Sequence, residues 1–359
     1  RALPRARVAV AWVFRPDWLA QAPRLEWIAT PAAGRDYFQV ARPGLDITYG
    51  AFHGRIMGET VAAMVLAVNR GLLANQDARA AGNPWPRDAL AGIMRTLAGT
   101  HAVIVGFGHI GTWIGRNLKP FGVRLTGVRR HPRAAPRPDY FARHDRLAGL
   151  ERLDALLPTA DHLILALPAT PASDGLMSAA RLARLPPRAA VYNVGRGNVL
   201  DEAALARALV RGRLRAAALD VFRQEPLPAG SPLRGAPNTL LLPHASTVAP
   251  EYLDLFLDET KTIYTNLIGI EFELRKDGFS IIPALSLGVA EQSDDPFLLA
   301  GTRLTQGRSL LQRAHRDGDD SLIARADGPV RRPRDLEGRT VGVTGAAGFD
   351  LLDGRMAVF

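Results

Sequence analysis

Between residues 101 and 245, short apolar runs alternate with amphipathic stretches, and this alternation limits the folds open to the chain more than any other feature. The apolar runs are His101–Val105, Val123–Val128, His162–Leu167, Ala190–Asn193, Leu214–Val221 and Thr239–Leu242. Stretches with helical spacing lie between them, at Ile110–Pro120, Leu147–Leu157, Ala179–Leu185 and Glu202–Arg211. Uniformly apolar runs are typical of strands buried on both faces, as in parallel sheets covered by helices. We therefore predict an α/β fold with a doubly wound parallel sheet, and a last helix capped by Asp201 and stopped by Gly212.

A glycine-rich motif directly follows the first apolar run and precedes a helical pattern. Its residues are Gly106, Phe107, Gly108, His109, Ile110 and Gly111. The first glycine allows a tight turn, the second lets a pyrophosphate approach the backbone, and the third lets the helix pack on the strand. Unpaired amides at the helix N-terminus would receive the phosphates. An ordinary strand–helix turn is the alternative, but the surrounding strand candidates favour dinucleotide binding at Gly106, Gly108, His109, Ile110 and Gly111.

The end of the second apolar run bears on the choice of dinucleotide. A site for NAD has an acidic residue there, which accepts hydrogen bonds from the adenosine ribose. In this chain Arg129 and Arg130 stand at that point. Guanidinium groups pair with a 2′-phosphate, whereas a carboxylate would repel it. We predict that NADP is preferred, with NAD as the alternative. The alternative that Arg129 and Arg130 are ordinary surface residues also stays open, because the chain is rich in arginine, which makes up 42 of its 45 basic residues.

Composition and charge narrow the class of protein further. Hydrophobic residues make up 47% of the 359-residue chain, which is enough for a full core. The formal net charge is +10, and residues 101–245 carry 20 basic against 10 acidic residues. A local polyanionic ligand in this segment and a solvated basic surface both explain that excess. Cysteine is absent, which excludes disulfides and thiolate chemistry.

Other classes of site and location find no support in the sequence. The histidines do not have zinc-ligand spacing and no G-x-S-x-G motif occurs, so we expect neither a metal site nor serine hydrolase chemistry. No apolar run approaches the roughly 20 residues that cross a bilayer, and no signal peptide is recognisable. The prediction is a cytoplasmic protein that binds a small molecule and neither nucleic acid nor membrane.

Three further segments make a family resemblance visible. They are Asn193–Asp201 with Arg196, Ala218–Pro226 with Glu225, and Leu242–Ser246 with His244. With the glycine loop, their order and spacing resemble the D-isomer-specific 2-hydroxyacid dehydrogenases over roughly residues 18–275. The resemblance implies that Arg196 binds the substrate carboxylate and carbonyl, that His244 is the acid/base, and that Glu225 is its partner.

These roles also make chemical sense for reduction of a 2-keto acid. Hydride adds to the carbon and a proton must reach the oxygen, which a histidine such as His244 can supply near neutral pH. A carboxylate such as Glu225 stabilises the protonated ring and fixes its tautomer. An arginine such as Arg196 can stabilise charge that develops on the oxygen. Each residue alone has a structural alternative, as a loop cap, a turn residue or a core histidine. All three in the family's order favour the catalytic interpretation.

The resemblance also implies the domain organisation. We expect a Rossmann-type NAD(P)-binding domain at residues 98–245 and a smaller, discontinuous, flavodoxin-like substrate domain at residues 1–97 and 246–278, with the active site in the cleft between them. The family usually has another strand and helix ahead of the N-terminal loop, so we expect the substrate domain to be incomplete. A homodimer through the cofactor domain is implied as well. Residues 279–359 do not match the family and form an extension, either a truncated fusion or an unrelated tail.

The implied site residues extend beyond the three polar side chains. Backbone amides at Ala33 and Gly34 would receive the substrate carboxylate. Further cofactor contacts are implied at six positions, namely Leu167, Pro168, Val194, Gly195, Asp220 and Ser246.

The expected activity is hydride transfer between NAD(P)H and a 2-keto or D-2-hydroxy acid. A formate- or phosphite-type dehydrogenase on the same fold is less favoured, because formate enzymes of the family carry glutamine where Glu225 stands. A cofactor-sensing corepressor, which is not an enzyme, keeps the same polar residues and stays open as the alternative from another class.

Overall fold

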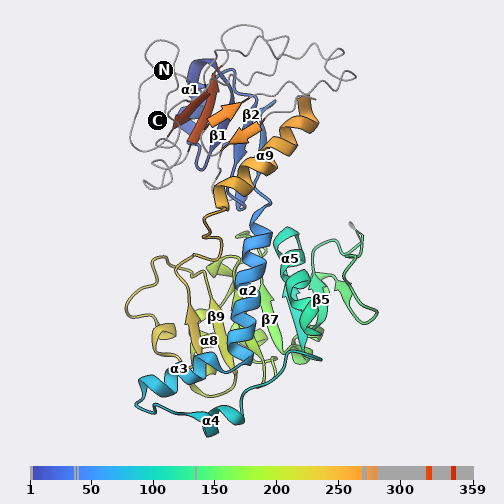
Figure 1. Cartoon of the computed structure of the whole chain (residues 1–359), viewed down its shortest axis with the longest axis vertical. Helices are drawn as coiled ribbons and strands as arrows, with labels where there is room; N and C mark the ends of the chain where they lie inside the picture. Colours follow the sequence, from blue (N-terminus) through green and yellow to red (C-terminus); the bar gives the residue numbers. More distant parts are fainter. Residues whose placement is uncertain are drawn as a thin grey trace. The chain divides into compact units, whose positions relative to one another are not determined.

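The computed structural model describes residues 3–35, 38, 40–133, 136–268, 273–275, 278–280, 321–325 and 341–344. The chain forms two compact units (Figure 1). Unit 1 contains Arg1–Phe52 and Pro250–Phe359, and unit 2 contains His53–Ala249.

Unit 2 is built on a seven-stranded sheet in the order β10-β9-β8-β7-β4-β5-β6, in which each pair of neighbours is parallel. Its strands are β4 (His101–Val105), β5 (Arg124–Val128), β6 (Arg146–Ala148), β7 (His162–Leu165), β8 (Ala190–Asn193), β9 (Ala216–Leu219) and β10 (Thr239–Leu241). β4, β7, β8 and β9 are buried at every residue. The predicted doubly wound α/β fold is confirmed.

Helices cover both faces of this sheet. Alternate residues of each strand point to opposite sides, so each strand contributes to two separate buried clusters. Val103 and Val105 belong to one buried cluster, whereas Ala102 and Ile104 belong to another. The helices of unit 2 are α2 (His53–Asn69), α3 (Leu72–Ala80), α4 (Arg87–Ala91), α5 (His109–Leu118), α6 (Leu153–Leu156), α7 (Ala179–Leu182) and α8 (Glu202–Val210). α2 and α5 pack on the second cluster, and the short helices α6 to α8 on the first. The Asp201 carboxylate caps α8 by accepting from the Ala204 amide at 2.9 Å.

α2 determines where the two units divide. It runs beside α5 (Figure 1) so closely that a Cβ on Gly58 would lie 3.2 Å from the backbone of Trp113. Its last turn is held to the residue directly before β9, since Arg215 donates to the Asn69 side chain at 2.8 Å. The units therefore divide at Phe52/His53 and Ala249/Pro250, whereas the sequence analysis set the domain limits at 97/98 and 245/246.

Unit 1 contains β1 (Ala6–Ala11), β2 (Trp27–Thr30) and β3 (Asp46–Tyr49), which are parallel neighbours, together with α1 (Pro16–Gln21) and α9 (Tyr252–Ile268). α9 returns to the N-terminal residues, as its position in unit 1 of Figure 1 shows. The Glu259 carboxylate accepts from the amides of Ala51 and Phe52 at 2.9 and 3.2 Å. The Tyr252 ring packs edge-on against Phe52.

Four short strands from the C-terminal part of the chain also belong to unit 1. β11 (Glu273–Arg275) pairs with β12 (Gly278–Ser280). β13 (Ser321–Arg325) pairs antiparallel with β1 and with β14 (Val341–Thr344). The predicted extension at 279–359 therefore contributes two strands to the sheet of unit 1. Its other residues after Ser280 lie outside the described part of the chain, and so does the choice between a truncated fusion and an unrelated tail.

Within the described residues, no single helix is long and apolar enough to cross a membrane. The bent pair of α2 and α3, with 61° between them, meets that criterion only when the two are taken together.

A polar pair lies inside the sheet of unit 2. His162 at the start of β7 is 1% exposed, and its Nδ1 lies 3.0 Å from the hydroxyl of Tyr192, which is fully buried in β8. Burial lowers the pKa of His162 to about 4, because a charged ring would lose its hydration there. The ring is therefore neutral in the folded protein at pH 7.

We expect this histidine to make the folded state sensitive to acid. In the unfolded chain the ring titrates near 6.5, so its contribution is complete above that pH and is lost as the pH falls toward 4. The free energy of unfolding should fall by about 1.4 kcal/mol per pH unit from this group, about 3 kcal/mol in total. His162→Gln, which keeps a partner for Tyr192, should flatten the slope measured by urea denaturation between pH 7 and 5. His144→Gln, at an exposed position, is the control and should leave the slope unchanged.

Candidate functional site

The predicted site residues of unit 2 come from loops at one edge of the sheet. In a parallel sheet the carboxyl ends of all strands share an edge, and ligands bind where the strand order reverses. Here the order reverses between β4 and β7, since β4 continues to β5 on one side and β7 leads to β8 on the other. The glycine loop follows β4, Leu167 and Pro168 follow β7, and the remaining groups follow β5, β8, β9 and β10.

The glycine loop has the geometry that its sequence predicts. Gly106 has φ +97°, and a Cβ there would lie 2.4 Å from the Ala166 carbonyl oxygen. A Cβ on Gly111 would lie 2.5 Å from the Gly106 oxygen, so the first turn of α5 packs on the loop without a side chain. A Cβ on Gly108 would meet nothing within 4 Å. The loop is therefore tight at its two ends and open at its middle glycine, which fits a pyrophosphate at the N-terminus of α5.

A basic cavity of about 610 Å³ lies beside the ends of β5 and β6. Four arginines line it, Arg130, Arg133, Arg146 and Arg152, with Glu151 as an acidic neighbour. Arg129 is not among the lining residues; its Nη2 donates to the Pro132 carbonyl at 2.8 Å and its backbone amide to Ala148. Of the two predicted arginines, Arg129 thus ties the loop to itself and to β6, while Arg130 faces the cavity.

The loop after β8 carries Arg196. The Asn193 side chain accepts from the Gly195 amide at 3.1 Å and donates to the Arg196 carbonyl at 3.0 Å, which closes the turn. A Cβ on Gly195 would lie 2.4 Å from the Leu167 oxygen, so this loop and the loop after β7 are in backbone contact. The Arg196 backbone is extended and its side chain is part-exposed, with Nη1 donating to the Gly195 carbonyl at 2.9 Å.

The structure brings Glu225 and His244 together, from the loops after β9 and β10. His244 Nδ1 lies 2.7 Å from Glu225 Oε2, and both side chains are about one third exposed. Glu225 Oε1 accepts from the Phe222 amide at 2.9 Å, which fixes the carboxylate. With Glu225 ionised, Nδ1 carries the proton that faces it, and Nε2 is the ring nitrogen that can exchange a proton with a substrate.

Asp220 holds the backbone that carries His244. Its side chain is fully buried, and its carboxylate accepts from the amides of Ala245 at 2.6 Å and Ser246 at 3.1 Å. The His244 amide donates to the Asp220 carbonyl at 2.8 Å, and His244 itself has φ +54°. The predicted cofactor residues Asp220 and Ser246 therefore contact each other directly and set the position of the histidine.

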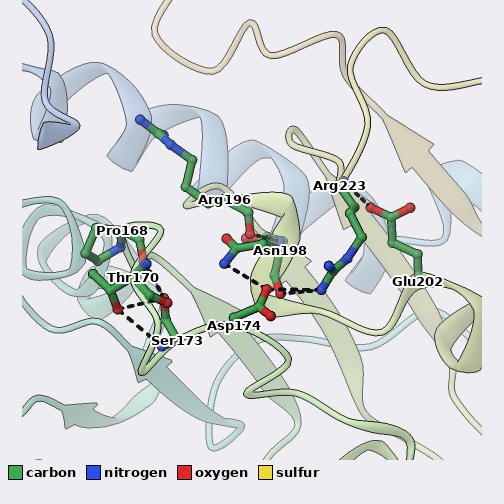
Figure 2. A network of polar contacts seen from close by, with 9 residues as sticks. Pro168, Thr170, Ser173, Asp174, Arg196, Asn198, Glu202 and Arg223 are labelled. Carbon is green, nitrogen blue, oxygen red and sulfur yellow. Dashed lines mark hydrogen bonds and ion pairs between the residues drawn. The ribbon is translucent and has the colours of Figure 1, made fainter. Parts of the chain in front are cut away.

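The remaining predicted residues lie in two further loops. After β7, the Ser173 hydroxyl donates to the Pro168 carbonyl at 2.7 Å and holds the Leu167–Pro168 segment (Figure 2). Val194 is buried beside Gly195. Ala33 and Gly34 follow β2 in unit 1, where Ala33 is exposed and Gly34 is buried. In the described part of the chain, no group of three or more His, Asp or Glu side chains is arranged to hold a metal ion.

Sequence reasoning missed a polar network beside the Arg196 loop, drawn in Figure 2. The Arg223 side chain contacts Asp174 and Asn198, and its amide donates to Glu202 Oε1 at 2.6 Å. Burial raises the pKa of the Glu202 carboxyl, while the bond from the Arg223 amide opposes that shift. In the sequence Glu202 looks like an ordinary acidic residue in the first turn of a helix, so no signal distinguished it.

Comparisons with known proteins agree with this geometry. A model of the D-isomer specific 2-hydroxyacid dehydrogenase NAD binding domain matches residues 62–246. Glyoxylate/hydroxypyruvate reductase B of Pectobacterium atrosepticum is 35% identical over 66% of this chain and 73% of its own length. D-3-phosphoglycerate dehydrogenase of Mycobacterium bovis is 34% identical over 66% of this chain and 44% of its own. The crystal structure of a D-isomer specific 2-hydroxyacid dehydrogenase from Xanthobacter autotrophicus Py2, in complex with NADPH and MES, is 30% identical. It has a TM-score of 0.60 and covers 72% of this chain and 80% of that one.

A switch-point glycine loop on a parallel sheet, next to a histidine–carboxylate pair, defines a pyridine-nucleotide-dependent oxidoreductase. This chain belongs to the D-isomer-specific 2-hydroxyacid dehydrogenase family. It transfers hydride between NAD(P)H and a 2-keto or D-2-hydroxy acid, and these similarities favour the enzyme over the cofactor-sensing corepressor.

Proposed function

We propose that this enzyme reduces a short 2-keto acid, with glyoxylate and hydroxypyruvate as the first candidates, and that it prefers NADPH to NADH. The observation that carries the proposal is the 2.7 Å contact between His244 Nδ1 and Glu225 Oε2 at the sheet edge that also holds the glycine loop. The name of the Pectobacterium reductase supports these two keto acids as candidates.

We assign each polar residue of the site one role in this reaction. A bound nicotinamide cofactor would supply the hydride for the carbonyl carbon. His244 gives the proton from Nε2 to the carbonyl oxygen, while Glu225 contacts Nδ1 and orients the ring. Arg196 binds the keto acid and stabilises negative charge on its oxygen. The amides of Ala33 and Gly34 are proposed to receive the substrate carboxylate.

Binding of the cofactor is proposed to divide between two groups of residues. The amides after Gly106 and Gly108, up to Gly111, receive the pyrophosphate, since a Cβ at Gly108 would meet open space. Leu167, Pro168, Val194, Gly195, Asp220 and Ser246 complete the contacts along the same edge. The arginine-lined cavity after β5 and β6 receives the adenosine 2′-phosphate, and the NADPH complex of the Xanthobacter protein supports this choice of cofactor.

The expected homodimer and cytoplasmic location, and the absence of nucleic-acid and membrane partners, stay predictions.

A panel of 2-keto acids assayed with both cofactors tests the proposal. NADPH should give the higher kcat/KM with glyoxylate or hydroxypyruvate. Arg130→Asp should lower kcat/KM for NADPH by about tenfold or more while NADH is affected less, because a charge-assisted contact to the 2′-phosphate is worth about 1.5–3 kcal/mol. Arg213→Asp, an equal charge change at an exposed turn, should leave the preference intact. Equal use of both cofactors by the unaltered enzyme would refute the preference, and no turnover with any keto acid would refute the activity.

A further inference from the structure

We propose that Glu202 is a positioning residue for this reaction: it holds the Phe222–Arg223 peptide against the Arg196 loop and thereby keeps Glu225 in register with Arg196. The inference rests on the proposed function, because Arg196 and Glu225 act in it. Neither the family motif nor the sequence pattern assigns Glu202 a part in the site.

The two loops concerned touch through their main chains. A Cβ on Gly197 would lie 1.8 Å from the Phe222 carbonyl carbon and 2.2 Å from the Arg223 nitrogen. Gly197 is buried and directly follows Arg196. Since no side chain separates the loops, a small displacement of the Phe222–Arg223 peptide is transmitted to the Arg196 loop at once.

Two carboxylates hold consecutive amides of the turn after β9. The Arg223 amide donates to Glu202 Oε1 at 2.6 Å, and the Phe222 amide donates to Glu225 Oε1 at 2.9 Å. Glu202 lies in the first turn of α8, whose position is set by the Asp201 cap. Glu202 thus anchors to a helix the same turn that presents Glu225 to His244. Without this anchor the Arg223 amide loses its acceptor, and the turn is free to move the carboxylate away from the ring.

The Arg223 side chain adds a second, weaker connection. Its Nη2 donates to Asp174 Oδ1 at 3.2 Å and to the Asn198 carbonyl at 3.1 Å, and the Asn198 amide group donates to the same Asp174 oxygen (Figure 2). These contacts join the turn to the far end of the Arg196 loop. The Arg223 and Asp174 side chains are more than half exposed, so solvent screens their pairing and Glu202 carries most of the effect.

The test compares Glu202→Ala, Glu202→Gln and Arg207→Ala in the full chain, the last at an exposed position of the same helix. Glu202→Ala should lower kcat for keto-acid reduction about tenfold and raise KM for the keto acid, because the Arg196 loop moves with the turn, whereas the Kd for NADPH should stay within about twofold of the unaltered value. Hydrogen–deuterium exchange of peptides spanning residues 221–225 should become faster. Glu202→Gln keeps an oxygen that accepts from the Arg223 amide, so it should restore most of kcat and the slow exchange. Arg207→Ala should match the unaltered enzyme in every measurement.

Three results would overturn the proposal. The first is an unchanged kcat in Glu202→Ala. The second is an equal loss in the alanine and glutamine variants, together with weaker NADPH binding and a lower Tm, which indicates a general structural role. The third is unchanged exchange at residues 221–225 in Glu202→Ala. If the unaltered enzyme reduces no keto acid, the proposed function fails by itself. Hydrogen–deuterium exchange then tests Glu202 independently of activity. Faster exchange at residues 221–225 in Glu202→Ala, which Glu202→Gln reverses, supports the inference that Glu202 holds the turn.

Discussion

Replacing His244 by alanine is expected to lower kcat for keto-acid reduction by roughly 10²- to 10⁴-fold, the usual worth of a positioned general acid. In the proposed mechanism this ring gives the proton to the carbonyl oxygen, and the 2.7 Å contact with Glu225 orients the ring. Binding of NADPH should change little, because the proposed phosphate contacts lie in the loop after β4 and not at His244. Steady-state kinetics together with a fluorescence titration of NADPH measure the two effects separately.

A second variant at this position distinguishes loss of the general acid from loss of the folded backbone. His244 has φ +54°, a left-handed conformation in which alanine is strained but asparagine is tolerated. His244→Asn should therefore keep the backbone and still lose the activity. His144→Ala, at an exposed position elsewhere in unit 2, should retain full turnover. Near-normal kcat in both His244 variants would remove the acid/base assignment.

Gly197→Ala is expected to have the second large effect, a loss of kcat of at least about 100-fold. The added methyl would lie 1.8 Å from the Phe222 carbonyl carbon, so one of the two loops must move. The movement separates the Arg196 loop from the turn that carries Glu225, and the same overpacking should destabilise the fold by about 1–3 kcal/mol. Kinetics and thermal unfolding of the same preparations measure both consequences.

Gly230→Ala is the matched control for this substitution. A Cβ at Gly230 would meet nothing within 4 Å and its φ is not positive, so neither kcat nor Tm should change. If Gly197→Ala stays as active as Gly230→Ala, the two loops do not need to keep their backbone contact for catalysis. That result would also contradict the proposed positioning role of Glu202, which depends on this backbone contact.

The sequence predicted most of the cofactor-binding sheet, and the reason is visible in particular strands. β4, β7 and β8 are buried at every position, so most of their residues are apolar without alternation and the strands stand out from the helices around them. Apolar residues recur at helical spacing along Tyr252–Ile268 as well, and this pattern predicts α9 with its observed limits. The prediction of a helix over the whole of Leu147–Leu157 was wrong at its start, because β6 occupies Arg146–Ala148 and α6 covers only Leu153–Leu156. β6 is a three-residue edge strand with one exposed and two part-buried side chains, so it lacks the apolar run by which the other strands are recognised. β3 was missed for the same reason, since it too has no fully buried residue.

By itself, the sequence determined the fold class and the glycine loop, because each depends on local spacing along the chain, and its resemblance to the family pointed to Arg196, Glu225 and His244 as the candidate catalytic residues. Only the tertiary structure decided which of the two arginines after β5 faces the cavity, that α2 packs with the nucleotide-binding unit, and that Glu202 holds the turn of Glu225. These features depend on contacts between residues distant in sequence. A pattern of residue types along one chain does not encode which carboxylate meets which amide, since that is set by how the helices and loops pack on the sheet.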